Sequence, residues 1–171
     1  QKPIVTTRYK KYTDVDKLPY GVNCIVAIAS YSGFNQEDAV IINQTSIERG
    51  MFNTVYFRSY EDREEIDDNN ISHIFSNPNN YSNVKKSKQL NFDKLDENGF
   101  IREGVYVDDN DVIICKCAFD KEENITSVSS KTIKFGTCGI VDKVVVTRYD
   151  NNLRKCKIRI RKQKIPEVGD K

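Results

Sequence analysis

Two strand-like runs late in the sequence constrain the fold more than any other feature. Residues 139–149 and 153–164 are rich in β-branched side chains, and the Asp-Asn-Asn stretch at 150–152 between them is a strong hairpin signal. Because successive strand side chains point to opposite faces, the alternation in the second run predicts a buried apolar face and an exposed basic face. The apolar set is Cys156, Ile158 and Ile160, and the basic set is Lys155, Lys157, Arg159 and Arg161.

Three other segments favour strands. Residues 22–30 form a Val-, Ile- and Ala-rich run after a Tyr-Gly turn signal, which predicts a buried strand. Residues 54–60 alternate as a strand does, and residues 112–119 are a further apolar strand candidate. The predicted fold class is therefore mainly β.

Helix and loop signals fill the remaining stretches. Residues 44–49 favour a short helix, with Thr45 or Ser46 as its cap and Gly50 as its end. Residues 61–83 are acidic and then rich in Asn, which predicts a mobile surface excursion.

The composition supports a folded core and gives no membrane signal. The chain has 171 residues, of which 38% are hydrophobic, too many for a disordered chain. Its longest apolar run, residues 24–29, is far too short to span a bilayer, and no secretory signal opens the sequence, so we expect no membrane partner. Because the sequence starts at Gln1 without Met and stops at Lys171 after Gly-Asp, we expect both ends to be cuts through a longer protein.

The cysteines predict free thiols and no zinc site. Their number is five, and an odd number without a secretory signal is typical of a reducing compartment. The only close pair, Cys115 and Cys117, is separated by a single residue, and the one histidine, His73, lies far from it. Structural zinc normally needs four convergent ligands, so we expect none here.

Charge is distributed unevenly although the net charge is only +2. Acidic residues crowd positions 61–68, whereas positions 154–164 hold seven basic residues and no acidic one. Such a basic run is either a solvated strand face or a surface that faces nucleic-acid phosphates, because clustered Lys and Arg bind by displacing counterions. Charge alone leaves both interpretations open.

The most informative segment is residues 21–52, where an apolar run leads into a turn that presents Glu37 and Asp38. Adjacent carboxylates repel each other unless solvent or a cation compensates, and Mg²⁺ prefers such hard oxygen ligands. Taken alone, a Glu-Asp pair is more often an exposed turn than a metal site.

The longer pattern narrows the choice. Residues 31–38 read Tyr-Ser-Gly-Phe-Asn-Gln-Glu-Asp, and residues 46–52 read Ser-Ile-Glu-Arg-Gly-Met-Phe. This pattern resembles the hybrid-binding region of the second-largest subunit of multi-subunit DNA-directed RNA polymerases, with Phe34 where the family usually has Tyr. Three more blocks resemble the same subunit in the same order: the entry into this region, the wall (the flap in bacteria) and the return, at residues 1–8, 57–60 with 93–99, and 159–171. The eukaryotic, archaeal and large-virus branch fits better than the bacterial one.

The resemblance implies a fold and a division of the chain. In this family the hybrid-binding region is part of a double-psi β-barrel, and a β-rich wall is inserted between its strands. The chain would divide into residues 1–53 and 156–171 for the hybrid-binding region and residues 54–155 for the wall.

The resemblance also implies an active-site role. The family extends RNA by nucleotidyl transfer with two Mg²⁺ ions, of which the permanent one is held by the largest subunit. Asp38, with Glu37 beside it, matches the carboxylates that face the second Mg²⁺, directly or through water. Lys164 and Lys171 match two lysines near the RNA 3′ end and the incoming nucleotide. Because Lys164 shares the parity of the apolar set, it reaches the active centre only if the chain bends or bulges near residues 162–163. Lys162 is the alternative, and three residues are expected to neutralise the nucleic-acid backbone: Arg159, Arg161 and Lys162.

The implied partners are those of a transcribing polymerase: the largest subunit and other subunits, template DNA, the RNA–DNA hybrid and nucleoside triphosphates. The expected location is the nucleus, or the cytoplasm (a viral factory) for a large DNA virus. Without the largest subunit's aspartates, the chain alone is expected to be inactive. The alternative is a non-catalytic, wall-like module that binds nucleic acid or transcription factors. A carboxylate-pair hydrolase is a third idea, for which the sequence offers no nucleophile or second acid.

Overall fold

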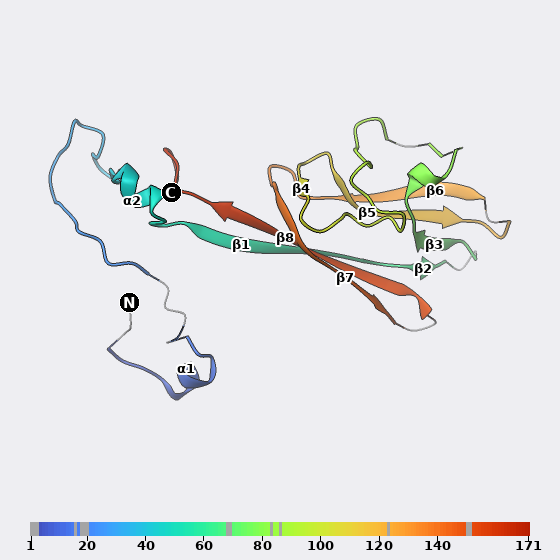
Figure 1. Ribbon diagram of the computed structural model, residues 1–171, viewed down its shortest axis with the longest axis horizontal. Coiled ribbons are helices and arrows are strands. Elements are labelled where there is room, and N and C mark those ends of the chain that lie inside the picture. The colour runs from blue at the N-terminus through green and yellow to red at the C-terminus, as the bar shows by residue number, and fades with distance from the viewer. Residues whose placement is uncertain are drawn as a thin grey trace. The chain divides into compact units, whose positions relative to one another are not determined.

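A computed structural model describes residues 4–15, 17, 21–67, 70–82, 84–85, 87–122, 124–149 and 152–171. The chain separates into two compact units, which we call the first unit (Gln1–Thr54 with Ile165–Lys171) and the second unit (Val55–Lys164). All strands of the described residues lie between Thr54 and Lys164 (Figure 1). The prediction of a mainly β chain is confirmed, while the double-psi barrel stays a prediction.

Two four-stranded sheets make up the second unit. The first sheet has the order β1-β8-β7-β4, with β1 (Thr54–Arg63), β8 (Arg154–Lys164), β7 (Gly139–Arg148) and β4 (Tyr106–Val107). The second sheet has the order β2-β3-β5-β6, with β2 (Glu65–Ile66), β3 (Ser72–Phe75), β5 (Val112–Phe119) and β6 (Ile125–Thr132). The strands expected at 54–60 and 112–119 are confirmed. Strand β6 has no counterpart among the predicted strands, because its Ser- and Thr-rich sequence lacks a strong apolar alternation.

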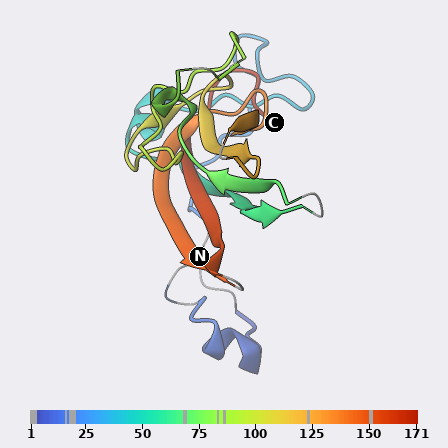
Figure 2. The same cartoon turned by 90° about the vertical axis from the view of Figure 1, so that its right-hand side faces the viewer.

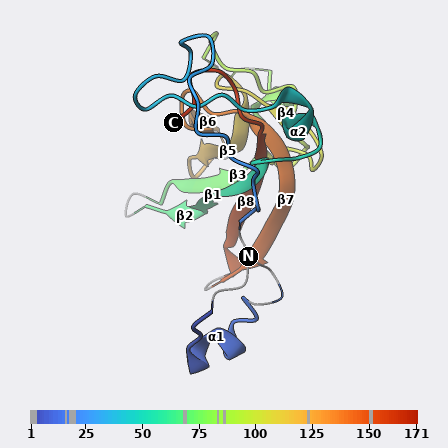
Figure 3. The same cartoon turned by 90° about the vertical axis from the view of Figure 1, so that its left-hand side faces the viewer.

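Strands β7 and β8 form a long antiparallel hairpin. Its antiparallel register runs from Ile140 opposite Arg161 to Arg148 opposite Arg154, and the two strands curve together in both side views (Figures 2 and 3). The predicted hairpin is confirmed, although Asp150 and Asn151 of its turn lie outside the described residues.

The predicted alternation along β8 is confirmed as well. Cys156 and Ile158 are 0% exposed and Ile160 is 6% exposed, whereas the four basic residues between and around them are exposed. Fully burying one Ile side chain contributes about 1.5–3 kcal/mol. The apolar face of β8 therefore anchors the strand in a core that draws on both sheets and on the loop around residue 95: Phe75, Phe92, Leu95, Phe100, Ile101, Val107, Val112, Ile113, Ile114, Cys115, Ile133, Val141, Cys156, Ile158 and Ile160.

The prediction of a mobile surface excursion over residues 61–83 is wrong for most of its length. Strand β1 continues to Arg63, β2 and β3 follow, and a 3-10 helix, η1, covers Pro78–Asn80. The polar composition is misleading because polar side chains bond to the backbone here. The buried Asn77 side chain donates a hydrogen bond to the Asp96 carbonyl at 2.9 Å. It also accepts one from the Asn79 amide of η1 at 2.9 Å.

In the first unit, the predicted buried strand over residues 22–30 is also wrong. These residues form no regular structure, and the side chains of Ile25 and Ile28 are fully exposed. A strand needs a neighbouring strand to take up its backbone hydrogen bonds, and the described part of this unit contains no strand that pairs with this run. Residues 22–30 therefore have the composition of a buried strand but lack a neighbouring strand to pair with in the described part of this unit.

Two short helices, α1 (Arg8–Tyr12) and α2 (Gln44–Glu48), complete the first unit. The helix expected near 44–49 and its end at Gly50, which has a φ of +104°, are confirmed. The predicted cap is wrong: the side-chain oxygen of Asn43, one residue before the helix, accepts from the Ser46 amide at 3.0 Å. No helix among the described residues is long and apolar enough to cross a membrane.

Candidate functional site

Asn35 holds together the loop that carries the candidate carboxylates. Its side chain accepts a hydrogen bond from the Tyr31 amide at 2.8 Å and donates one to the Ala29 carbonyl at 2.6 Å. Within the same loop, the Phe34 amide donates a hydrogen bond to the Tyr31 carbonyl at 3.3 Å and closes a tight turn. The turn has Gly33 at a φ of +72°, a conformation that suits glycine. Local side-chain bonds of this kind therefore shape a loop that has no strand partner.

A second tight turn presents the two carboxylates. The Ala39 amide bonds to the Gln36 carbonyl at 3.2 Å, so Glu37 and Asp38 are the central residues of this turn. Glu37 has a φ of +55°, a left-handed conformation that costs a non-glycine residue about 1–2 kcal/mol. Both side chains are exposed, and within the described residues neither has a side-chain hydrogen bond or ion pair. The two carboxylates are thus open to solvent and to any approaching cation.

As metal ligands, the two carboxylates form an incomplete set. Their oxygen atoms are the kind that Mg²⁺ prefers, but Mg²⁺ demands a near-ideal octahedron of ligands and usually keeps several waters. The pair fits a contact to an ion whose other ligands come from elsewhere. Across the described ranges, no group of three or more His, Cys, Asp or Glu residues could hold a metal ion.

Arg159, on the basic face of β8, is engaged by the strands on both sides. Its guanidinium contacts the Asp142 carboxylate of β7 with N–O distances of 2.6 Å and 2.5 Å. The same group lies over the Phe57 ring of β1, 5.0 Å from the ring centroid. Arg159 therefore joins three strands of the first sheet, which is a structural role in addition to any contact with nucleic acid.

The other basic residues on this face differ in their surroundings. Lys155 lies 3.4 Å from the Glu61 carboxylate, an exposed pair of small energetic weight. Lys157 and Arg161 are exposed, and the described residues include no ion pair with either. The basic face thus combines paired residues with two cations that are open to solvent.

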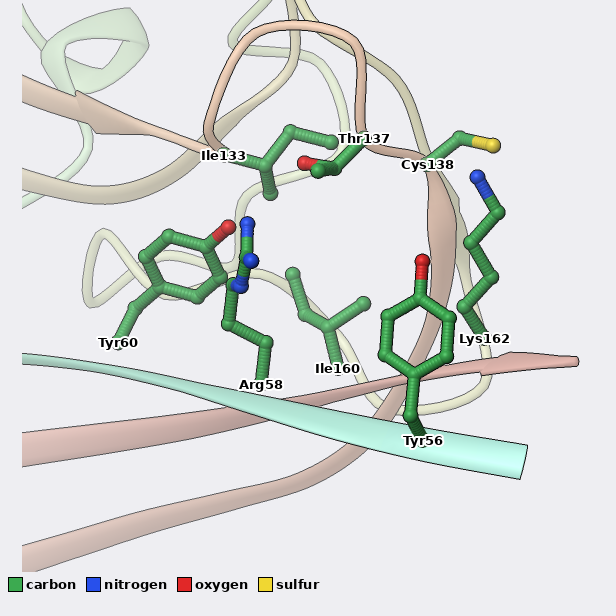
Figure 4. A pocket seen from close by; sticks show the side chains of 8 residues that line it. All are labelled: Tyr56, Arg58, Tyr60, Ile133, Thr137, Cys138, Ile160 and Lys162. Carbon is green, nitrogen blue, oxygen red and sulfur yellow. The ribbon is translucent and has the colours of Figure 1, made fainter. Parts of the chain in front are cut away.

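Lys162 points to the other side of β8, the side of Ile160. It lines a small cavity of about 10 Å³ (Figure 4). Its amine lies near the Cys138 thiol, and its positive charge helps to lower the pKa of Cys138 (Figure 4). The walls of the cavity come from β1, from β8 and from the connection between β6 and β7: Tyr56, Arg58, Tyr60, Ile133, Thr137, Cys138, Ile160 and Lys162.

The remaining two candidate lysines lie at the ends of their segments. Strand β8 runs unbroken to Lys164, and the bend or bulge expected near residues 162–163 stays a prediction. Lys171 is exposed and follows a turn in which the Asp170 carboxylate accepts from the Glu167 amide at 2.8 Å. In the described part of the first unit, no ion pair joins Lys171 to the carboxylate turn. The structure thus groups the carboxylates on one turn and the residues from Arg159 to Lys164 on one strand.

A buried ion pair is an important contact that the sequence did not reveal. The Glu64 side chain is 5% exposed and accepts from the Arg154 guanidinium at 2.7 and 2.9 Å, from the Arg154 amide at 2.7 Å and from the Phe75 amide at 2.9 Å. This one carboxylate joins β8 of the first sheet to β3 of the second. The only signal of this ion pair in the sequence is the acidic stretch at 61–68, which complements the basic run at 154–164. That signal suggests that the two segments pair, but it does not predict that the pair is buried.

Asp62 makes a second internal contact from the acidic stretch. Its carboxylate lies 2.8 Å from the Lys116 amine and 3.7 Å from the Lys131 amine. Burial works against ionisation, but the hydrogen bond and charge of Lys116, with the charge of Lys131, hold the pKa of Asp62 below its ordinary value. The acidic stretch therefore serves internal packing.

Comparison with known sequences decides the family. The sequence profile described as RNA polymerase Rpb2, domain 6, matches residues 1–171, the whole chain. The chain belongs to this family.

Relatives of this Rpb2 domain 6 chain are subunits of DNA-directed RNA polymerases. The RNA polymerase II subunit RPB2 of Eremothecium gossypii is 41% identical to it, and RNA polymerase II subunit 2 of Arabidopsis thaliana is 38% identical. Subunit 2 of the Acanthamoeba polyphaga mimivirus polymerase is 36% identical. Each alignment covers 100% of this chain and 15% of the relative, so the chain spans a small part of the length of these subunits. The resemblance to the second-largest subunit of the eukaryotic, archaeal and viral branch is confirmed.

Proposed function

We propose that this Rpb2 domain 6 chain is a segment of a catalytic second-largest subunit, where it contributes to the nucleotidyl-transfer site and to binding of the RNA–DNA hybrid. The supporting observation is the turn that presents Glu37 and Asp38, side by side and exposed, in a chain of this family. Strained backbone positions such as that of Glu37 persist only where the surrounding structure holds them, and they cluster at functional sites. The backbone hydrogen bond from the Ala39 amide to the Gln36 carbonyl closes the turn around Glu37, and Asn35 holds the turn before it.

The role of the turn is to hold carboxylate oxygens where a nucleotide-borne Mg²⁺ can meet them. Asp38, with Glu37 beside it, would contact that ion directly or through water. When bound, such an ion stabilises the charge that develops on the transferred phosphoryl group. This chain would position the ligands, because the tight turn presents both carboxylates at the surface. The other ligands of the ion would come from the nucleotide and from the largest subunit.

The basic residues have complementary roles. Lys164 and Lys171 provide compact positive charges for the RNA 3′ end and the nucleotide phosphates. Lys162 is the alternative to Lys164, and its amine lies near the Cys138 thiol. Arg161 is open to solvent and suits contact with the nucleic-acid backbone. Arg159 suits it less, because Asp142 and Phe57 already engage its guanidinium.

The proposed activity belongs to an assembled enzyme. The partners are the largest subunit and the other polymerase subunits, template DNA, the RNA–DNA hybrid and nucleoside triphosphates. The chain alone is inactive in this proposal because it holds only part of the metal ligands. Since relatives include RNA polymerase II subunits and a viral polymerase subunit, the proposed location is the nucleus, or the cytoplasm for a viral protein.

Asp38→Ala in the complete polymerase tests this proposal. We expect the elongation rate to fall about tenfold at limiting Mg²⁺, which corresponds to about 1.4 kcal/mol, and to fall less at saturating Mg²⁺. Glu37→Ala is expected to have a smaller effect if its neighbour makes the closer contact. Glu122→Ala, which removes an exposed carboxylate after β5, is the matched control. Unchanged elongation of the Asp38 variant across the whole Mg²⁺ titration would sink the proposal.

A second candidate function is a non-catalytic, wall-like module that binds nucleic acid or transcription factors. The second unit has its own core, and Lys157 and Arg161 are open on its surface, which favours this candidate. It predicts normal elongation by the Asp38→Ala enzyme but weaker binding of the partner after the double change Lys157→Ala with Arg161→Ala.

A further inference from the structure

Strand β7 lacks a neighbouring strand along much of its outer edge. The fourth strand of the first sheet, β4, pairs only with Gly139 and Ile140, and the chain just before β4 bonds to the backbone of Val141. From Val144 to Arg148, no strand of the described residues pairs with the outer side of β7, and Figure 3 shows β7 at the border of the hairpin. This edge of the sheet is therefore open to another backbone.

The hydrogen bonds of β7 indicate which backbone groups point outward. Val144 donates its amide to the Glu103 carboxylate at 2.8 Å instead of to a neighbouring strand. In an antiparallel pair, every second residue bonds to the partner strand, and the residues between them turn their backbone groups to the other side. No register shift interrupts the pairing with β8 after Val144, so Val146 and Arg148 also turn their amides and carbonyls outward. Within the described part of the chain, no backbone partner takes up these groups.

The side chains along this edge are apolar in the middle and basic at both ends. Val145 and Val146 point to opposite faces and are 40% and 42% exposed, so apolar surface is accessible on both faces. Lys143 and Arg148 are exposed, and the described residues include no ion pair with either. Proteins usually protect an open edge with a charge, a proline or a bulge, and residues 144–147 contain none of these.

We propose that the edge of β7 from Lys143 to Arg148 binds an extended segment of another protein, which adds to the first sheet as a further strand. The segment has apolar side chains at its centre and acidic side chains at its ends. Backbone hydrogen bonds to Val146 and Arg148 supply affinity, and the side chains select the partner. The Glu103 carboxylate, already bonded to this edge, is an example of the acidic group that fits here.

A second copy of this chain is a poorer occupant, because its own β7 edge would bring the same cations, Lys143 and Arg148, to a basic edge. The inference uses neither the carboxylate turn nor the candidate active-site lysines. It therefore holds whether or not the chain takes part in catalysis.

The experiment uses the assembled polymerase with its complete subunit and two fluorescent probe peptides. One is acetyl-Glu-Glu-Val-Thr-Val-Glu-Glu-amide, and the other has Lys in place of each Glu. Anisotropy measures binding, and hydrogen–deuterium exchange of the Arg148 amide measures strand pairing. We expect the glutamate peptide to bind about tenfold more tightly than the lysine peptide and to slow exchange at Arg148. If exchange is already slow without peptide, a sister subunit supplies the strand, and the proline variant described next is expected to restore fast exchange.

Val146→Pro removes the outward amide. Because this amide does not bond to β8, a proline at this edge position is compatible with the sheet. We expect the Kd of the glutamate peptide to rise about tenfold and Arg148 to exchange fast. Val146→Ala is the matched control, since it keeps the amide, and its Kd is expected to change less than about threefold. Lys143→Glu should weaken binding of the glutamate peptide relative to the lysine peptide, and it tests the proposal even if the proline variant fails to fold.

Three results would overturn the inference. The first is equal binding of the two peptides, or a Kd that neither Val146→Pro nor Lys143→Glu changes. The second is fast exchange of the Arg148 amide both with and without the glutamate peptide. The third is dimerisation of the enzyme in sedimentation experiments that Val146→Pro abolishes, because it would assign the edge to a second copy.

Discussion

At the scale of single residues, the second unit depends on side chains that join distant parts of the sequence. The Glu64 carboxylate accepts four hydrogen bonds, three of them from Arg154, which is 90 positions away. A buried charge is tolerated only when partners replace the water that it loses. Arg154 and the Phe75 amide provide those partners. The Glu64–Arg154 pair therefore stabilises the contact between β3 and β8.

Arg154→Met tests the weight of this pair. The change leaves Glu64 buried without its counter-charge, and breaking a buried pair in this way costs about 3–5 kcal/mol. We expect faster hydrogen–deuterium exchange of the Phe75 amide in the complete subunit. Lys155→Met is the matched control, because it breaks only an exposed pair and is expected to cost about 0–1 kcal/mol. Equal exchange in the two variants would contradict the structural role of Glu64.

At the scale of elements, the two faces of β8 have different roles. One face packs Cys156, Ile158 and Ile160 into the core, and the other carries exposed basic residues. Gly139, opposite the end of this strand on β7, has no room for a side chain, since an added Cβ would lie 2.6 Å from the Arg161 carbonyl. The strand pair is therefore closely packed on one side and open to charged partners on the other.

Substitutions at neighbouring positions of β8 should have opposite consequences. Ile158→Asp places a charge in the core and forfeits about 1.5–3 kcal/mol of apolar burial, so this region is expected to unfold. Lys157→Asp changes an exposed side chain and is expected to leave the fold intact. Circular dichroism and limited proteolysis of the complete subunit compare the two, and a stable Ile158 variant would be the unexpected result.

Substitution of Lys164, on the same strand, should affect the elongation rate but not the stability. In the complete polymerase we expect Lys164→Ala to lower the elongation rate with little loss of stability, because the residue lies beyond the last buried Ile of β8. Lys157→Ala is expected to weaken salt-dependent nucleic-acid contacts or to have no effect. If Lys162→Ala lowers the rate and Lys164→Ala does not, the active-site lysine is Lys162.

At the scale of the whole molecule, the two units differ in how they are stabilised. The second unit has a continuous core between two sheets, whereas the first unit exposes apolar side chains such as Ile25 and Ile28 and depends on short-range bonds. Binding residues are proposed in both units. Among the described residues, neither unit holds a group of three or more side chains that could bind a metal ion. The chain spans about 15% of its relatives.

The isolated chain is expected to incorporate no nucleotide with any divalent metal. It should bind single-stranded RNA or hybrid weakly, and binding should fall as salt rises, since each phosphate contact on a single strand contributes about −0.7 to the slope of log K against log salt. Filter binding over a salt series, with the Lys157→Ala and Arg161→Ala double variant as control, measures this. Tight binding that resists salt or selects a sequence would point instead to an independent recognition module.

Much of the local structure could be predicted from the sequence. The alternation along β8, the hairpin with β7, the bounds of β5 and the end of α2 at Gly50 all follow from patterns within a few neighbouring residues. Side-chain alternation and turn chemistry are local properties, so they can be recognised without knowledge of partners. The motif around Glu37 and Asp38 was equally visible, because it is contiguous.

The tertiary structure alone decided what depends on distant partners. Residues 61–66 and 72–80 are ordered because Arg154, Lys116 and Asp96 supply bonds from far along the chain, while residues 22–30 stay exposed because the described residues offer them no strand partner. The cavity lined by Tyr56, Cys138 and Lys162 likewise requires β1, β8 and the connection before β7 to be adjacent. Sequence patterns carry the preferences of a segment, but burial and pKa depend on the neighbours that folding brings to it.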